Sequence, residues 1–174
     1  MFKCCVLGLG YIGLPTAAIL AKSGYDVVGV DIDKKKVDLI NKGSIYLKEP
    51  NLDKLVTELV DKKKLIASHN ISNADIFIIA VPTPFIKSES GIPKPDLSFM
   101  ENASLALAEV LEEGNTVIIE STIPVGTTKK MAELILAKSN LKKNQIKFAH
   151  CPERVLPGKI LEEVQKGYVL NGRV

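Results

Sequence analysis

The most constraining feature of this sequence is a glycine-rich segment that joins an apolar run to a helical pattern. Residues 2–7 are mostly apolar, residues 8–13 read Gly-Leu-Gly-Tyr-Ile-Gly, and the following apolar spacing predicts a helix over residues 11–23. Glycines in this G-x-G-x-x-G spacing are typical of a turn that cradles a pyrophosphate at the N-terminus of a helix. The chain therefore begins like a strand, a phosphate-binding turn and a helix.

Each glycine of the turn has its own structural role. Gly8 permits the tight passage from strand to helix, and Gly10 has no Cβ and lets a pyrophosphate approach the backbone. Gly13 allows the helix to pack closely on a sheet. The same spacing also occurs in ordinary glycine-rich turns, so the surrounding pattern has to decide between the two interpretations.

The second apolar run favours the dinucleotide site. Residues 25–30 are predicted to form a short buried strand that ends at Asp31, about 20 residues after the glycines, where a Rossmann fold binds the adenosine ribose. A carboxylate accepts hydrogen bonds from the ribose diol and repels the additional phosphate of NADP, so the expected cofactor is NAD. Asp31 as a helix cap or turn residue is the alternative. The Lys34–Lys36 run is either a phosphate ligand or the solvated first turn of a helix.

Apolar runs alternate with helical patterns along the rest of the chain, which is the order of an α/β protein. The runs are apolar without alternation, as in parallel strands covered on both faces. We therefore predict a Rossmann-type, doubly wound parallel sheet with helices on both faces, in an NAD-binding domain of residues 1–150. Residues 82–96 are the longest expected loop, and a further strand is expected to begin near Val169. The expected strands are 2–7, 26–31, 65–67, 75–81, 115–120 and 146–150, and the expected helices are 11–23, 34–42, 51–62, 98–112 (capped by Asp96) and 127–139.

Composition excludes several other classes of protein. The length of 174 residues is enough for one domain and a short additional segment. The net charge of +3 is small, the chain has no tryptophan, and its lysine clusters contain no aromatic residues, so we predict no nucleic-acid partner. No apolar run reaches the roughly 18 residues of a membrane span, and the first strand leaves no room for a signal peptide. Three cysteines match neither a disulfide framework nor a zinc site, so we expect a cytoplasmic protein without a bound metal.

Polar residues follow the expected strands 75–81 and 115–120, at the edge where ligands bind in an open parallel sheet. Thr83 lies between two prolines that keep the backbone extended, and it is either a ligand-facing hydroxyl or simply the start of a loop. Among the hydroxyls after the next strand, we expect Thr127 to cap a helix and Ser121 and Thr122 to face the cleft.

The last expected strand, 146–150, is followed by Glu153 and Arg154 between two prolines. These two residues form either a surface ion pair or a proton-transfer carboxylate beside a guanidinium for an anionic substrate. His150 and Cys151 look like a base and a nucleophile, but adjacent residues at a strand end point in opposite directions. No catalytic thiol is therefore expected at this place.

In their order along the chain, these motifs resemble the N-terminal NAD-binding domain of nucleotide-sugar 6-dehydrogenases, the UDP-glucose/GDP-mannose dehydrogenase family. The segment Cys-Pro-Glu-Arg-Val-Leu-Pro-Gly at 151–158 is similar to the branch that oxidises UDP-N-acetyl-D-mannosamine. UDP-N-acetylglucosamine dehydrogenases are the main alternative, while the UDP-glucose branch typically has Asn-Pro-Glu-Phe-Leu-Arg-Glu-Gly there. The matching segments are Gly8–Pro15, Val30–Asp33, Val81–Pro84, Glu120–Thr127 and Pro152–Glu153.

The resemblance implies a four-electron oxidation in polysaccharide biosynthesis, in which the C6 alcohol of the sugar becomes a carboxylate and two NAD⁺ are reduced in turn. A cysteine of such enzymes traps the intermediate aldehyde, and water hydrolyses the resulting thioester. By the same resemblance, Thr122 holds the catalytic water, and Glu153 lies between cofactor and substrate as a base or a thioester-hydrolysis carboxylate. Arg154 and Val155 are implied to touch the sugar nucleotide. The implied NAD contacts are Gly8, Gly10, Tyr11, Ile12, Gly13, Asp31, Lys36, Thr83, Thr122 and Thr128.

The family's nucleophilic cysteine, its catalytic lysine and the central helix that pairs subunits belong to later segments, and no cysteine of this chain matches the nucleophile's motif. Residues 151–174 are expected to be a strand-end loop and the start of the connection to that helix and a C-terminal domain. We expect the chain to bind NAD and, alone, to turn over no UDP-sugar, and the full-length protein to be a homodimer. A methyltransferase is disfavoured by Gly13 inside the helix, and a non-catalytic NAD-sensing module by the polar strand ends.

Overall fold

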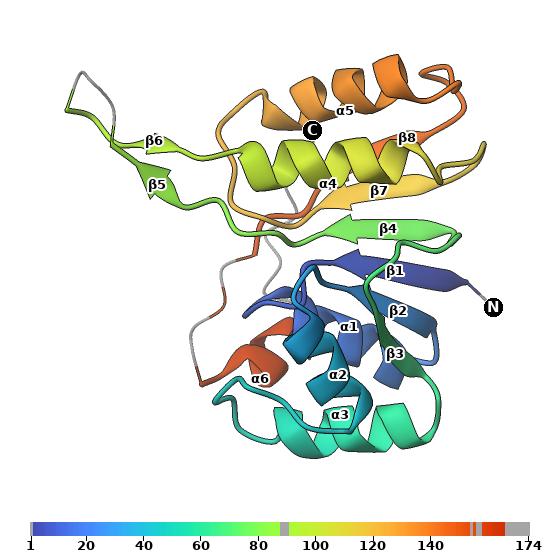
Figure 1. Ribbon diagram of the computed structural model, residues 1–174, viewed down its shortest axis with the longest axis vertical. Coiled ribbons are helices and arrows are strands. Elements are labelled where there is room, and N and C mark those ends of the chain that lie inside the picture. The colour runs from blue at the N-terminus through green and yellow to red at the C-terminus, as the bar shows by residue number, and fades with distance from the viewer. Residues whose placement is uncertain (1, 88–90, 154, 156–157, 166–174) are drawn as a thin grey trace.

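Six parallel strands form one sheet: β1 (Lys3–Leu7), β2 (Asp26–Val30), β3 (Leu65–Ser68), β4 (Ile76–Ile79), β7 (Thr116–Ile119) and β8 (Lys147–His150). Their spatial order is β3-β2-β1-β4-β7-β8 (Figure 1), in a computed structural model that describes residues 2–87, 91–153, 155 and 158–165. A chain that starts at the centre and fills each half of the sheet in turn has the doubly wound, Rossmann-type order. The predicted fold class is confirmed, and the six strands expected within residues 1–150 are present.

Helices pack on both faces of the sheet because its strands are apolar on both sides. Cys4 and Cys5 show the alternation along β1, since both are buried and each belongs to a different apolar cluster. They are small core side chains on opposite faces of the sheet. The first cluster includes side chains of α1 (Gly13–Lys22), α2 (Lys34–Asn41) and α3 (Leu52–Asp61), and the second includes side chains of α4 (Ser98–Ala108) and α5 (Thr127–Lys138).

The helix starts show which capping predictions hold. Asp96, the predicted cap of α4, accepts the N–H of Ser98 at 2.9 Å, although Leu97 is the residue directly before the helix. Asp33, which was not predicted as a cap, caps α2 by accepting the N–H of Lys35 at 2.9 Å. The predicted cap of α5 is wrong, because Thr127 is the buried first residue of that helix. Gly126 precedes it with φ of 88°, a left-handed backbone that turns the chain into the helix without a capping side chain.

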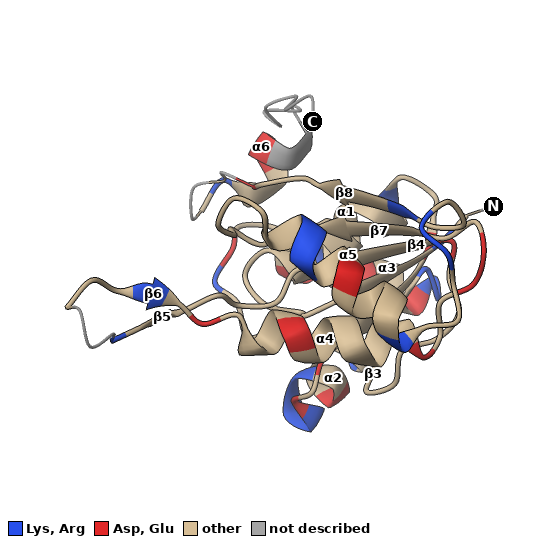
Figure 2. Ribbon diagram, turned by 90° about the horizontal axis from the view of Figure 1, so that it is seen from above, with Lys and Arg blue, Asp and Glu red and all other residues tan. Residues whose placement is uncertain are grey.

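Three short elements were not expected from the sequence. Within the loop 82–96, β5 (Phe85–Ile86) and β6 (Lys94–Pro95) pair antiparallel and project away from the body of the protein (Figures 1 and 2). After the sheet, α6 (Ile160–Gln165) packs against α1. Strands of two residues and a helix of six are too short to leave a periodic pattern. The strand expected near Val169 lies outside the described residues.

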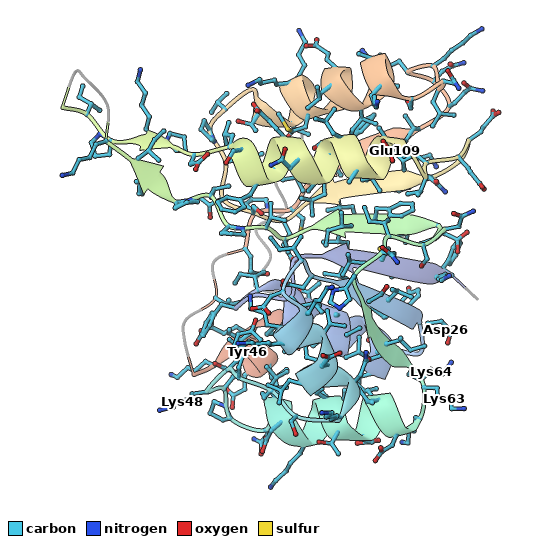
Figure 3. All side chains as sticks on the ribbon, in the orientation of Figure 1. Asp26, Tyr46, Lys48, Lys63, Lys64 and Glu109 are labelled. Atoms are coloured by element: carbon cyan, nitrogen blue, oxygen red, sulfur yellow. The ribbon has the colours of Figure 1, made fainter. Side chains whose placement is uncertain are left out.

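The carboxyl ends of the parallel strands meet at one edge of the sheet, on the side from which the hairpin projects (Figure 1). At the opposite edge, the exposed side chains of Lys64 and Asp26 form an ion pair of 2.7 Å (Figure 3). In Figure 2, α2 and α5 each carry both basic and acidic residues. Across the described ranges, no helix is both long and apolar enough to cross a bilayer.

Backbone contacts fix the glycine turn between β1 and α1. A Cβ on Gly13 would lie 1.9 Å from the carbonyl oxygen of Gly8, far inside any real contact distance. Gly8 has φ of 91°, and a Cβ there would lie 2.7 Å from the carbonyl oxygen of Ala80. By contrast, a Cβ on Gly10 would meet nothing within 4 Å. Gly8 and Gly13 are therefore required by the fold itself, as their predicted packing roles imply, whereas Gly10 is not.

We predict that Gly13→Ala lowers the free energy of unfolding by about 3 kcal/mol or more, because backbone and helix must move apart to admit the methyl group. Urea denaturation of the purified chain measures this change. Gly10→Ala is the matched control and should change the stability by no more than about 1 kcal/mol, since its methyl group enters open space. Equal losses in the two variants would contradict the packing explanation.

Candidate functional site

A cavity of about 1050 Å³ opens at the carboxyl edge of the sheet. Its walls come from the glycine turn, from the ends of β2, β4 and β7, and from α4. A space of this size accommodates a dinucleotide-sized ligand. Eight of the residues predicted for the site line it together: Gly8, Gly10, Tyr11, Ile12, Asp31, Lys36, Thr83 and Thr122.

The glycine turn fits a phosphate group. Among the described residues, no side chain caps the N-terminus of α1, and no acidic residue lies in its first turn. The N-terminus of a helix carries the positive end of the helix dipole, which favours a negatively charged group beside it. Together with the open space beside Gly10, this leaves the turn able to receive a pyrophosphate.

Asp31 holds the turn in place as well as facing the cavity. Its carboxylate is 8% exposed and accepts the N–H of Leu9 at 2.9 Å through Oδ2 and the N–H of Asp33 at 2.9 Å through Oδ1. Asp33 is the cap of α2, so the helix-cap alternative for Asp31 is wrong, while the turn role is real. Since each carboxylate oxygen accepts more than one hydrogen bond, the structural contacts leave capacity for a ribose diol.

The lysine run after β2 divides into two parts. Lys34 and Lys35 are exposed, as expected for a solvated first turn. Lys36 instead lines the cavity, where its Nζ lies 3.7 Å from Oδ2 of Asp31 and 5.1 Å from the ring centre of Tyr46. Both contacts hold this cation beside the carboxylate, in the region of the site where the adenosine ribose is expected.

Tyr46 is a cavity residue that the sequence did not indicate. Figure 3 shows it on the connection between α2 and α3, and its hydroxyl donates a hydrogen bond to the carbonyl oxygen of Leu9. Burial, followed by the charges of Asp31 and Asp33, raises the pKa of Tyr46 to about 12, so the phenol stays a donor at neutral pH. No local pattern marks a loop tyrosine of this kind.

Other lining residues were also missed. His69 and Ile71 follow β3, so the strand-end rule applied to the other strands would have found them. The ring Nδ1 of His69 lies 3.2 Å from the carbonyl oxygen of Asp31. The cavity face of α4, which includes Phe99 and Asn102, depends on how the helix packs and has no local sequence signal.

Hydroxyl groups tie the ends of β4 and β7 together below the cavity. Thr83 donates to the carbonyl oxygen of Thr122 at 2.8 Å, and Ser121 donates to the carbonyl oxygen of Val81 at 2.6 Å. Both residues line the cavity, so Ser121 faces the cleft as expected, although its hydroxyl donates to the backbone of the protein. Thr122 is exposed in the cavity wall.

Four predicted site residues do not line the cavity as the structure has it. Gly13 is buried behind the turn, and Thr128 is half-buried in the first turn of α5. Glu153 and Val155 are half-buried in the segment after β8. Their proposed contacts with cofactor or substrate stay predictions, and Arg154 lies outside the described residues.

Glu120, at the carboxyl end of β7, is a buried carboxyl group that sequence reasoning did not single out. It is 7% exposed; its Oε1 accepts a hydrogen bond of 2.9 Å from the hydroxyl of Thr16 on α1, and its Oε2 has no partner among the described residues. Burial raises its pKa to about 7, the Thr16 hydrogen bond opposes this rise, and the charge of Glu153 adds to it. The group therefore changes its charge near neutral pH.

The cysteine of the strand-end segment is not activated. Burial raises the pKa of Cys151, and the nearby charges of Glu120 and Glu153 raise it further, which disfavours the reactive thiolate. The ring Nε2 of His150 lies 3.3 Å from the carbonyl oxygen of Ser121. In the described ranges, no group of three or more His, Cys, Asp or Glu side chains is placed to hold a metal ion.

Comparison with known proteins shows which family this chain resembles. The family model described as "UDP-glucose/GDP-mannose dehydrogenase family, NAD binding domain" matches residues 2–170. A UDP-N-acetyl-D-mannosamine dehydrogenase of Methanococcus maripaludis (strain C7 / ATCC BAA-1331) is 47% identical over 171 residues, covering 98% of this chain and 38% of the relative. The enzyme of the same name from Campylobacter jejuni is 50% identical over 179 residues, and the match covers 98% of this chain and 43% of the relative.

A solved structure of the UDP-D-ManNAc dehydrogenase from Pyrococcus horikoshii superposes with a TM-score of 0.87 at 44% identity, covering 93% of this chain and 38% of that one. The chain thus spans about two fifths of the length of the curated relatives that it matches. The similarity covers the fold of nearly the whole chain, and it leaves about three fifths of the length of these relatives unmatched.

We predict that the stability of the chain falls between about pH 4.5 and pH 7 because of Glu120. The Glu120 carboxyl binds its proton more tightly in the folded protein than in the unfolded chain, where its pKa is near 4.5. Ionisation of Glu120 therefore does not lower the free energy of unfolding below about pH 4.5, and it lowers this free energy by its full amount above about pH 7. Glu120→Gln keeps an acceptor for Thr16 and removes the titration. The free energy of unfolding of this variant, relative to that of the wild type, should be about 2 kcal/mol larger at pH 8 than at pH 5.

Urea denaturation at the two pH values measures this difference, with Glu109→Gln at the exposed end of α4 as the matched control. The control substitution should change the free energy of unfolding by the same amount at both pH values. A pH-independent effect of Glu120→Gln would show that Glu120 does not titrate as predicted.

Proposed function

Because the chain belongs to the UDP-glucose/GDP-mannose dehydrogenase family, as its NAD-binding domain, we propose that it holds NAD for a nucleotide-sugar 6-dehydrogenase. The single observation that carries this proposal is the meeting of the glycine turn and Asp31 in one cavity at the carboxyl edge of the sheet. The proposed reaction is oxidation of the C6 alcohol of UDP-N-acetyl-D-mannosamine to the uronate, with reduction of two NAD⁺ and consumption of one water.

The cavity residues support an orientation for the cofactor. The turn at Gly8–Gly10 and the start of α1 would receive the pyrophosphate, while Asp31 would accept hydrogen bonds from the adenosine ribose. Thr83 and Thr122, at the ends of β4 and β7, would then line the part of the cavity nearer the reacting groups. When bound there, NAD supplies the hydride acceptor.

Residues after β7 and β8 would act on the sugar. Thr122 would hold the water that completes the oxidation, and Glu153 would move protons as a base or during thioester hydrolysis. Glu153, Arg154 and Val155 would meet the sugar nucleotide. Cys4 and Cys5 are buried in the sheet and Cys151 has a raised pKa, so none of the three is proposed as the nucleophile. That group and the catalytic lysine would come from the part of the relatives' length that this chain does not span.

Support for the substrate comes from the names of the relatives and from the segment 151–158, which is similar to the branch for UDP-N-acetyl-D-mannosamine. We propose further that the full-length protein works as a cytoplasmic homodimer in polysaccharide biosynthesis, pairing through the central helix that the family has after this domain. This part of the proposal rests on the family resemblance alone.

A calorimetric titration of the chain tests the cofactor. We predict that NAD⁺ binds at least about tenfold more tightly than NADP⁺, because the buried Asp31 carboxylate repels a 2′-phosphate. S-adenosylmethionine should give no heat of binding. The chain should produce no NADH from NAD⁺ and UDP-N-acetyl-D-mannosamine, whereas the full-length protein should, and it should prefer this sugar to its N-acetylglucosamine and glucose counterparts. Binding of S-adenosylmethionine in place of NAD⁺ would overturn the assignment.

A second prediction separates binding from folding at the turn. Gly10→Ala should weaken NAD⁺ binding about tenfold or more, because its Cβ enters the space that the pyrophosphate would occupy. Calorimetry compares it with Ser44→Ala, an exposed position outside the cavity lining, which should bind like the wild type. Unchanged affinity in Gly10→Ala would mean that the phosphate does not lie at this turn.

A further inference from the structure

Glu49 is a buried carboxylate that joins two parts of the chain far apart in sequence. It lies on the connection between α2 and α3 and is 6% exposed. Its Oε2 accepts hydrogen bonds from the hydroxyl of Tyr11 at 3.1 Å and from the N–H of Gly158 at 2.8 Å. Its Oε1 accepts the N–H of Ile160 at 2.8 Å. One side chain therefore connects the glycine turn with the segment that follows β8.

The segment 158–165 depends on these contacts for its position. A six-residue helix such as α6 is not stable by itself, because so short a helix forms too few hydrogen bonds to offset the unfavourable free energy of nucleation. Its start is held by Glu49 and by burial of the Ile160 side chain, which is 1% exposed. N–H groups that donate to a buried carboxylate make strong, charge-assisted hydrogen bonds, so Glu49 is the polar anchor of this segment.

Tyr11 is the donor that a ligand in the cavity would reach. It is 37% exposed and lines the cavity, whereas Glu49 itself does not. Burial and the neighbouring Glu49 carboxylate raise the pKa of Tyr11, so its hydroxyl keeps the proton that it donates. A ligand that covers Tyr11 excludes water from this hydrogen bond, and a hydrogen bond with less access to water is stronger.

We propose that Glu49 is a positioning residue that couples occupation of the cofactor cavity to the order of residues 158–165. This inference rests on the proposed function, because it takes NAD as the occupant. The coupled segment begins three residues after Val155, the last of the proposed sugar contacts, so cofactor binding would prepare the substrate side of the site. Such coupling is reciprocal: if NAD orders the segment, the ordered segment binds NAD more tightly.

A purely structural role for Glu49 predicts a different result. In that case Glu49 would hold residues 158–165 equally well with the cavity empty or filled, and Tyr11 would contribute only its own contact with the cofactor. Amide hydrogen exchange separates the two roles, because it reports the opening of residues 158–165 with and without ligand.

The experiment measures exchange of the peptide covering 158–165 in the chain, with and without saturating NAD⁺. We expect NAD⁺ to slow exchange about fivefold, the effect of roughly one hydrogen bond. Tyr11→Phe should keep the basal protection, because both backbone contacts of Glu49 remain, and should lose the NAD⁺-dependent gain. Its NAD⁺ affinity should fall about fivefold by reciprocity. Tyr25→Phe, outside the cavity lining, is the matched control and should behave like the wild type.

Glu49→Gln should lose about tenfold of the basal protection, since a neutral amide has one acceptor in place of two charged ones. Glu58→Gln on the exposed face of α3 should lose none. If Glu49→Gln does not fold, the comparison of Tyr11→Phe with Tyr25→Phe still decides. NAD⁺ binding without any change in exchange, or with the same gain in Tyr11→Phe, would overturn the coupling. Failure of NAD⁺ to bind the wild type would instead overturn the proposed function and, with it, this inference.

Discussion

The close approach of backbone at the turn between β1 and α1 is the constraint on which the site depends. Any side chain at Gly13 would collide with the carbonyl of Gly8, and a Cβ at Gly8 would collide with the backbone at Ala80. The turn can therefore lie between the ends of β1 and β4 only because both residues are glycine. This placement brings the N-terminus of α1, which carries the positive end of the helix dipole, to the carboxyl edge of the sheet, where the cavity opens.

Three buried carboxyl groups then set the chemistry around this turn, each in a different way. Asp31 accepts two backbone N–H groups and fixes the turn against the end of β2. Glu49 accepts three hydrogen bonds and joins the turn to the segment after β8. Glu120 has a partner at only one oxygen, and burial raises its pKa to about 7. Asp31 and Glu49 thus fix the backbone around the turn, and Glu120 adds a group that changes its charge near neutral pH.

Local sequence pattern predicted the parallel sheet and much of the cavity. Apolar runs mark the strands, and the rule that ligands bind at their carboxyl ends placed Asp31, Thr83 and Thr122 in one cavity before their contacts were known. The pattern did not predict the left-handed Gly126 before α5, the β5–β6 hairpin or α6. These elements are too short for periodicity, and packing or a single backbone conformation holds them in place.

The sequence by itself determined the doubly wound sheet, the glycine turn and the carboxylate after β2, because each depends on residues that are neighbours along the chain. Only the tertiary structure decided that Lys36 lies over the ring of Tyr46 and that the hydroxyl of Ser121 donates to the carbonyl oxygen of Val81. It also decided that Tyr11 and Gly158 both donate hydrogen bonds to Glu49. It also decided that Glu120 has an oxygen without a partner. Hydrogen bonding and loss of solvent depend on distances in space between residues up to 111 positions apart, which no local pattern records.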